Sequence, residues 1–164
     1  MSKVVISVVA KSGSGKTTLL EKVIRILKEK NIKLAVIKHD AHSFEMDKPG
    51  KDTWRHAQAG ADVIAISSPE KFAMIEKREV ELTLDEIVDR IEGVDLIITE
   101  GFKRQNKPKI EVFRSTAHST LLCEPKELIA IASDIPWDLG VPCYHIDDAA
   151  GIAEEIINFM NKEK

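Results

Sequence analysis

A buried strand, a glycine-rich turn and an amphipathic helix follow one another at the start of the chain, and this order constrains the fold most. Residues 4–9 are β-branched and nearly all apolar, as in a strand covered on both faces. After the turn, apolar residues recur at helical spacing, at Leu20, Val23, Ile24 and Leu27. Residues 34–37 have the pattern of a second strand. Residues 3–38 therefore predict a βαβ unit and a sheet that is at least partly parallel.

The turn has the composition of a phosphate-binding loop. It reads Lys11-Ser12-Gly13-Ser14-Gly15-Lys16-Thr17-Thr18 and lies between a strand and a helix, as such a loop requires. We expect its backbone N–H groups and the helix N-terminus to bind the phosphates of a nucleoside triphosphate. Lys16 would reach the β- and γ-phosphates, and the Thr17 hydroxyl would bind Mg²⁺. The usual loop begins with glycine where this chain has Ala10, and a methyl group is tolerable there if Ala10 keeps a negative φ.

The rest of the chain continues the α/β pattern. Helices are expected at residues 52–59, at 84–91 behind a Thr83–Glu86 capping box, and around residues 153–160. Strands are expected at residues 63–66, 72–75, 95–99, 110–113, 128–132 and 143–146. The first two of these strands would form an antiparallel hairpin. We predict one domain over residues 1–164, with a three-layer P-loop NTPase fold and a mostly parallel sheet that carries the hairpin as an extension.

Composition narrows the class of partners. Hydrophobic residues make up 43% of the chain and charged residues 31%, which suits a folded domain. The net charge is −3, so general affinity for nucleic acid or anionic lipid is not expected. The most apolar stretch, residues 4–10, is far too short to span a membrane. With no secretory signal pattern at the amino terminus, a cytoplasmic location is the expectation.

A carboxylate is needed to complete the metal site. Ligands in open α/β sheets lie beyond the carboxyl ends of the strands, so acidic residues that end strands beside the first strand are the candidates. Glu100 and Asp40 both qualify, and Glu100 is preferred. Lys16 and Glu100 are the candidate catalytic residues, and Thr17, Glu100 and Asp40 are the candidate Mg²⁺ ligands.

A long polar loop follows the second strand. Residues 38–56 carry three histidines and several cations, among them His42, Lys48, Lys51 and Arg55. His39 and His42 lack a third ligand at zinc spacing, so the sequence gives only a weak metal signal here. The triphosphate is already met by the phosphate loop, so we predict that His42, Lys51 and Arg55 bind a second ligand or a partner. The alternative is that these cations solvate the loop and pair with neighbouring aspartates.

Several motifs together resemble the molybdopterin-guanine dinucleotide biosynthesis protein B family, MobB. The motifs span about residues 5–113 and are the phosphate loop, Lys38-His39-Asp40 with His42, Pro49-Gly50-Lys51-Asp52-Thr53 with Arg55, Ala59-Gly60-Ala61, Glu100-Gly101-Phe102-Lys103, and Pro108-Lys109-Ile110-Glu111. The resemblance implies GTP binding with slow hydrolysis and partnership with the guanylyltransferase that joins GMP to molybdopterin. It also implies a homodimer, for which residues 61–80 offer an apolar hairpin edge. Molybdopterin, which carries a terminal phosphate, would be the second ligand.

Two questions stay open in the sequence. Asp134 ends a late strand where related GTPases place an aspartate that binds guanine, but the full N-K-x-D pattern is absent, and Asp134 could equally start a turn before Pro136. A small-molecule kinase would share the phosphate loop; against it, residues 114–127 hold a single arginine, Arg114, rather than an arginine-rich lid. A nucleotide-gated adapter that never hydrolyses GTP is the other alternative.

Overall fold

The computed structural model describes residues 3–163, which divide into two units. The first unit contains residues 3–39 and 84–163, and the second is Asp40–Thr83, which interrupts the first in sequence. The prediction of a single nucleotide-binding domain over the whole chain stays a prediction, because the division concerns packing alone. Among the described residues, no helix is both long enough and apolar enough to cross a bilayer.

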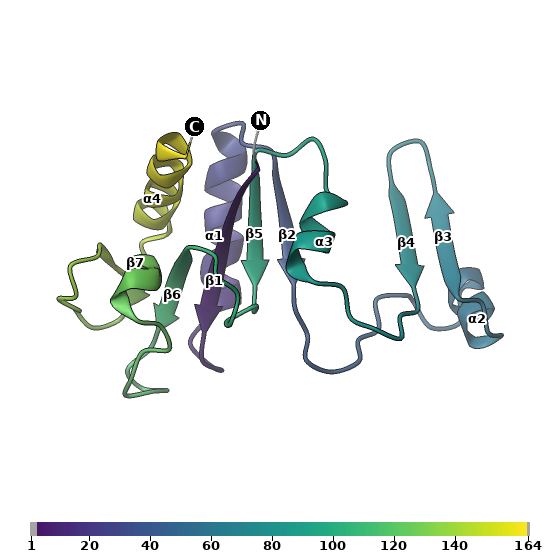
Figure 1. Ribbon diagram of the computed structural model, residues 1–164, viewed down its shortest axis with the longest axis horizontal. Helices are drawn as coiled ribbons and strands as arrows, with labels where there is room; N and C mark the ends of the chain where they lie inside the picture. The colour runs from purple at the N-terminus through teal and green to yellow at the C-terminus, as the bar shows by residue number, and fades with distance from the viewer. Residues whose placement is uncertain (1–2, 164) are drawn as a thin grey trace. The chain divides into compact units, whose positions relative to one another are not determined.

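The first unit is built on a six-stranded sheet in which every pairing is parallel. Its strands are β1 (Val4–Ala10), β2 (Leu34–Lys38), β5 (Leu96–Glu100), β6 (Lys109–Phe113), β7 (Leu128–Ser133) and β8 (Cys143–His145). The spatial order is β2-β5-β1-β6-β7-β8, and Figure 1 shows the first five of these side by side. The predicted parallel sheet is confirmed. Strand β1, which leads into the phosphate loop, lies between β5 and β6.

Helices cover both faces of this sheet. Helices α1 (Lys16–Glu29) and α4 (Ala149–Lys162) pack on each other and on one face, where the predicted stripe of α1 is buried. Helix α3 (Leu84–Asp89) packs on the other face through Leu84, beside Ile37 and Ile97. Alternation along β1 explains the two cores, since Val4 and Ile6 belong to the first and Val5 to the second. The three-layer α/β architecture is confirmed.

The second unit contains a short helix and a hairpin. Helix α2 (Asp52–Gln58) is followed by β3 (Val63–Ser67) and β4 (Phe72–Glu76), which pair antiparallel from Val63↔Glu76 to Ser67↔Phe72. The helix and the hairpin are where the sequence predicts them. The hairpin, however, forms a two-stranded sheet of its own and adds no strand to the six-stranded sheet. Apolar alternation predicts strands and their pairing with a near neighbour, but it does not say which sheet a hairpin joins.

Parallel pairing brings the loops that follow β1, β5 and β6 to one edge of the sheet. Val8 is level with Glu100 on β5, and Ala10 is level with Val112 on β6. The phosphate loop therefore begins beside the ends of two neighbouring strands. A short 3₁₀ turn, η1 (Pro125–Glu127), then leads into β7.

Candidate nucleotide-binding site

The loop between β1 and α1 has the backbone geometry that phosphate binding needs. Gly13 and Gly15 have φ of 80° and 84°, conformations that a side chain would strain. Gly15 is also the residue before the first turn of α1, and no side chain caps the helix N–H groups there. Those donors are therefore available to an anion. The Ser14 hydroxyl donates to the Lys11 carbonyl at 2.8 Å and holds the turn.

The departure at Ala10 is accommodated. Ala10 is the last residue of β1 and is 5% exposed, and it is not among the described non-glycine residues with positive φ. The condition set by the sequence is met, because the strained conformations fall on Gly13 and Gly15. A methyl group at the start of the loop therefore fits the buried strand.

Lys16, Thr17 and Glu100 come together at the carboxyl edge of β1 and β5. Lys16 Nζ lies 3.6 Å from Glu100 Oε1, and the Thr17 hydroxyl donates to the same oxygen at 3.3 Å. The side chains of Lys16 and Glu100 are 20% and 15% exposed, so the pair is sheltered but open to a ligand. A hydroxyl, a carboxylate and phosphate oxygens are hard oxygen ligands of the kind Mg²⁺ takes. The three residues fit the metal end of a triphosphate site.

A transition-metal site receives no support. Among the described residues there is no group of three or more His, Cys, Asp and Glu side chains that could hold a metal ion. One carboxylate beside a phosphate loop suits Mg²⁺, which keeps several water ligands and binds through the phosphates. His39 has another contact: its ring lies 4.8 Å from that of Phe102, next to the Glu100-Gly101 turn.

The other candidate metal ligand belongs to the second unit. Asp40 is exposed, and its carboxylate accepts a hydrogen bond from the His42 backbone N–H at 3.1 Å. The structure thus brings Glu100 to Lys16 and Thr17, whereas Asp40 is grouped with the polar loop. Its role as a metal ligand stays a prediction.

The cations predicted to bind a second ligand are exposed in the second unit. Lys51 precedes the first turn of α2, and Arg55 lies one turn later, with its N–H bonded to the Lys51 carbonyl at 2.9 Å. His42 is also exposed. Asp47 accepts hydrogen bonds from the Lys48 backbone and the Thr53 hydroxyl. Lys48, Lys51 and Arg55 form no ion pair with any residue in the described part of the chain, and their binding of a second ligand stays a prediction.

Asp134 has a partner inside the protein. Its two carboxylate oxygens accept from the Ser115 backbone N–H at 2.7 Å and from the Ser115 hydroxyl at 2.8 Å. The first of these hydrogen bonds is the main reason why the pKa of Asp134 is lowered from its ordinary value. Asp134 thus joins the end of β7 to the segment that follows β6. Its contact with guanine stays a prediction.

Sequence reasoning missed a segment that contacts the phosphate loop. After β6, His118 Nε2 lies 2.7 Å from the Ser12 carbonyl, and Lys11 Nζ donates to both the carbonyl and the hydroxyl of Thr120 at 2.7 Å. Arg114 lies beside Gly15. The available signal was the buried strand 110–113, but only the strand order shows that it lies next to β1.

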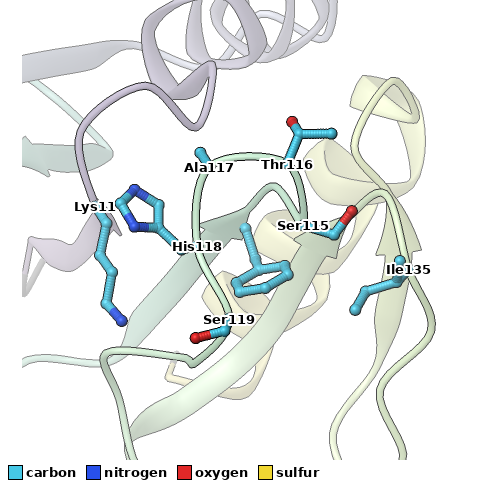
Figure 2. A pocket seen from close by; sticks show the side chains of 8 residues that line it. Lys11, Ser115, Thr116, Ala117, His118, Ser119 and Ile135 are labelled. Atoms are coloured by element: carbon cyan, nitrogen blue, oxygen red, sulfur yellow. The ribbon is translucent and has the colours of Figure 1, made fainter.

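This segment also borders an open cavity of about 550 Å³ beside the loop. In Figure 2 the side chains of Lys11 and His118 lie on one side of it and Ile135 on the other. The residues that line it are Lys11, Phe113, Ser115, Thr116, Ala117, His118, Ser119 and Ile135. The cavity has polar and apolar walls and lies beside Lys11, at the start of the phosphate loop.

Comparison with known proteins agrees with the motifs. The family model for molybdopterin guanine dinucleotide synthesis protein B matches residues 5–134, most of the chain. The chain belongs to this family. A relative from Escherichia coli (strain K12), named molybdopterin-guanine dinucleotide biosynthesis adapter protein, is 37% identical over 158 residues, which cover 93% of this chain and 90% of the relative. A relative of the same name from Haemophilus influenzae (strain ATCC 51907 / DSM 11121 / KW20 / Rd) is 34% identical over 152 residues, 92% of this chain and 85% of that protein.

Solved structures of the MobB family have the same fold. A crystal structure of molybdopterin-guanine biosynthesis protein B matches with a TM-score of 0.74 and 31% identity, and the match covers 95% of this chain and 99% of that one. The crystal structure of Bacillus subtilis MobB matches with a TM-score of 0.73 and 28% identity, over 94% and 96% of the two chains. The P-loop NTPase-like fold and the family resemblance predicted from sequence are confirmed.

Proposed function

We propose that this MobB-family protein binds GTP with Mg²⁺ at its phosphate loop and acts as an adapter in the synthesis of molybdopterin guanine dinucleotide. Its partner would be the guanylyltransferase that joins GMP to molybdopterin. The observation that carries the proposal is the convergence of Lys16, Thr17 and Glu100 beside the uncapped start of α1. The relatives named as adapter proteins for this dinucleotide support the pathway.

The chemistry of the site favours tight positioning over fast turnover. The loop backbone and Lys16 would hold the phosphates, and Mg²⁺ bound near Thr17 and Glu100 would offset their charge. Hydrolysis also needs an oriented water, and Glu100, the carboxylate at the site, is engaged with Lys16 and Thr17. We therefore expect weak GTP hydrolysis. Turnover measured with and without the guanylyltransferase distinguishes a slow GTPase from an adapter that only binds GTP.

Parallel titrations with GTP and ATP in the presence of Mg²⁺ test the proposal. We expect the protein to bind GTP, with ATP weaker, and Lys16→Ala to abolish measurable binding. The thermal unfolding midpoint should stay close to that of the parent, because Lys16 is the first residue of α1 and belongs to neither core. Arg25→Ala, which removes an exposed cation from the same helix, is the matched control. GTP binding by the Lys16 variant at parental affinity would rule out the phosphate-loop site.

We also propose that the exposed cations of the second unit bind an anion other than the triphosphate. Arg55 can hold a terminal phosphate through two parallel hydrogen bonds, as molybdopterin would offer, and Lys51 adds a point charge one turn away. Arg55→Ala and Lys51→Ala should each leave GTP affinity unchanged and reduce the stimulation of guanylyl transfer. Arg78→Ala, at another exposed arginine of this unit, is the control. Lower GTP affinity with normal stimulation would contradict this assignment.

A homodimer is the third part of the proposal. The hairpin β3–β4 has only two strands and exposes large apolar side chains, which a second copy of the chain would cover. The family resemblance points the same way.

A further inference from the structure

We propose that Arg114 is a second cation of the nucleotide site, one that binds the phosphate nearest the nucleoside. Arg114 follows β6 directly, and β6 pairs in parallel with β1 from Ser7↔Lys109 to Ala10↔Val112. The residue after β6 therefore emerges beside the phosphate loop, far from it in sequence. The inference rests on the proposed nucleotide binding and names a residue that no phosphate-loop pattern contains.

Arg114 touches the loop where the helix begins. A methyl group added to Gly15 would lie 3.2 Å from Arg114 Nη2 and 4.0 Å from its Nε, so the guanidinium rests against Gly15 itself. Arg114 also lines a small cavity of about 90 Å³ along the first turn of α1. Gly15, Thr18, Leu19, Lys22, Ile146 and Asp147 complete its lining. A phosphate held by the N–H groups of this turn would therefore meet the guanidinium.

The guanidinium is not engaged elsewhere. Arg114 is half-buried, yet its guanidinium makes no hydrogen bond or ion pair with another residue of the described chain. Its charge contributes to the lowered pKa of Asp134, but after the two hydrogen bonds from Ser115. Five N–H donors in a planar fork are thus left for a ligand, and a phosphate accepts two of them in parallel.

The backbone around Arg114 is fixed before any ligand arrives. Its carbonyl accepts from the N–H groups of Ala117 and His118, both at 3.1 Å, and Ser115 is held by Asp134. His118 in turn contacts the Ser12 carbonyl. A segment tied at these points presents the arginine without a large ordering cost, which is the condition under which one contact contributes most to affinity.

The side of β1 on which Arg114 lies indicates which phosphate it meets. Lys16, Thr17 and Glu100 mark the metal end of the site, on the β5 side, where a phosphate-loop lysine and hydroxyl serve the β- and γ-phosphates. Arg114 follows β6, on the opposite side of β1. An extended triphosphate that starts at the metal end would bring its α-phosphate toward Arg114. A contact of that kind is common to GTP and GDP.

Titrations of Arg114→Ala with GTP, GDP and inorganic tripolyphosphate test this assignment. Loss of a bidentate charged contact should weaken GTP and GDP by a similar factor, roughly ten- to hundredfold, with Arg114→Lys in between. Because an α-phosphate contact depends on how the nucleoside orients the chain of phosphates, tripolyphosphate should lose less. Arg25→Ala is the matched control for loss of a positive charge. Thermal unfolding without nucleotide is measured first, and Arg114→Lys keeps the side-chain stem should the alanine variant fail to fold.

The outcomes separate this inference from the proposed function. A parent protein that binds neither GTP nor tripolyphosphate overturns the nucleotide site and the inference together. A parent that binds GTP, with Arg114→Ala at parental affinity for both nucleotides, overturns the inference alone. Weakened GTP with unchanged GDP places the arginine at the γ-phosphate and also overturns it. Equal weakening of GTP and GDP in a variant that unfolds at the parental temperature supports it.

Discussion

Gly15 is the position where the loop, the helix and Arg114 meet. Its φ of 84° requires glycine, and the arginine occupies the space that a side chain would need. The sequence around Gly15 predicts that a glycine is needed there, because the spacing of Gly13, Gly15 and Lys16 is that of a phosphate loop. The sequence does not predict the contact with Arg114, since this residue follows a strand about a hundred residues later in the sequence. Residue types predict local geometry, whereas contacts between residues far apart in the sequence can be predicted only when the strand order is known.

We predict that Glu100→Gln lowers the rate of GTP hydrolysis much more than it lowers GTP affinity. Glu100→Gln removes the charge that faces Lys16 and Thr17 but keeps the size of the side chain. Neutralising a metal partner should lower Mg²⁺-dependent GTP hydrolysis by roughly tenfold or more, because charge stabilisation matters most in the transition state. GTP affinity should change much less, since the loop N–H groups remain. Single-turnover hydrolysis and equilibrium titration at the same Mg²⁺ concentration measure the two effects.

Asp40→Asn is the comparison for that experiment. It neutralises the other acidic strand-end candidate, which lies in the second unit and bonds to the His42 backbone. We expect its hydrolysis rate to match the parent. If Glu100→Gln turns over normally at limiting Mg²⁺ while Asp40→Asn is slow, the metal role belongs to Asp40.

At the scale of elements, β6 does more than extend the sheet. Lys109 and Glu111 are 2% and 1% exposed, although both are charged. Lys109 Nζ donates to the carbonyls of Gln105 and Lys107 and to the Glu127 carboxylate. The Glu111 carboxylate accepts hydrogen bonds from the backbone N–H groups of Leu122 and Cys123. Two buried charges on one strand thus hold the connections on both sides of it. A fully satisfied polar group of this kind fixes loops that apolar packing would leave free.

One of those connections ends near Cys123. Burial first, and the charge of Glu111 second, raise the pKa of the Cys123 thiol to about 12. The neutral thiol is therefore favoured in the folded state, and its contribution to stability is present below the ordinary cysteine pKa and lost as the pH rises toward 12.

Glu111→Gln should destabilise the fold. The amide keeps one oxygen acceptor but turns an NH₂ group toward the second backbone N–H, so a buried donor loses its partner. We expect the free energy of unfolding to fall by about 2 kcal/mol, the usual cost of one unsatisfied buried donor. Urea denaturation followed by circular dichroism measures it. Glu154→Gln, at an exposed position on α4, should stay within about 0.5 kcal/mol of the parent. Equal destabilisation by the two changes would show that the Glu111 contacts contribute nothing specific.

Periodicity predicts the elements better than their assembly. The stripe Leu20, Val23 and Leu27 is buried as expected, and the alternation at residues 63–76 predicts an antiparallel hairpin. Neither pattern says that β5 and not β2 lies beside β1, or that the hairpin forms a separate sheet. Glu100 could be predicted from the sequence because few strands end in an acidic residue. Arg114 could not be predicted, because an isolated arginine after a strand carries no local signal. Sheet order is a property of tertiary packing, which a single sequence does not encode in its periods.

For the molecule as a whole, the hairpin is the feature that calls for a partner. By the alternation of the pairs, Val63, Phe72 and Met74 point to one face of the two-stranded sheet and Ile66 and Ile75 to the other. All five are exposed, Phe72 by 65%. Helix α2 contacts β3 within the same unit. A two-stranded sheet is marginally stable by itself, and exposed apolar strands promote pairing with another chain.

We predict that the protein is a homodimer whose contact includes this hairpin. Light scattering at micromolar concentration should return twice the mass of one chain for the parent. Phe72→Asp places a charge on the apolar face and should give the monomer mass, because an unpaired buried charge is costly at an interface. Val36→Asp makes the same change at a residue that is 42% exposed on β2, which lies at one edge of the six-stranded sheet, and should leave the dimer intact. A parent of monomer mass would rule the dimer out, and dissociation by the Val36 variant alone would move the contact from the hairpin to the edge of the large sheet.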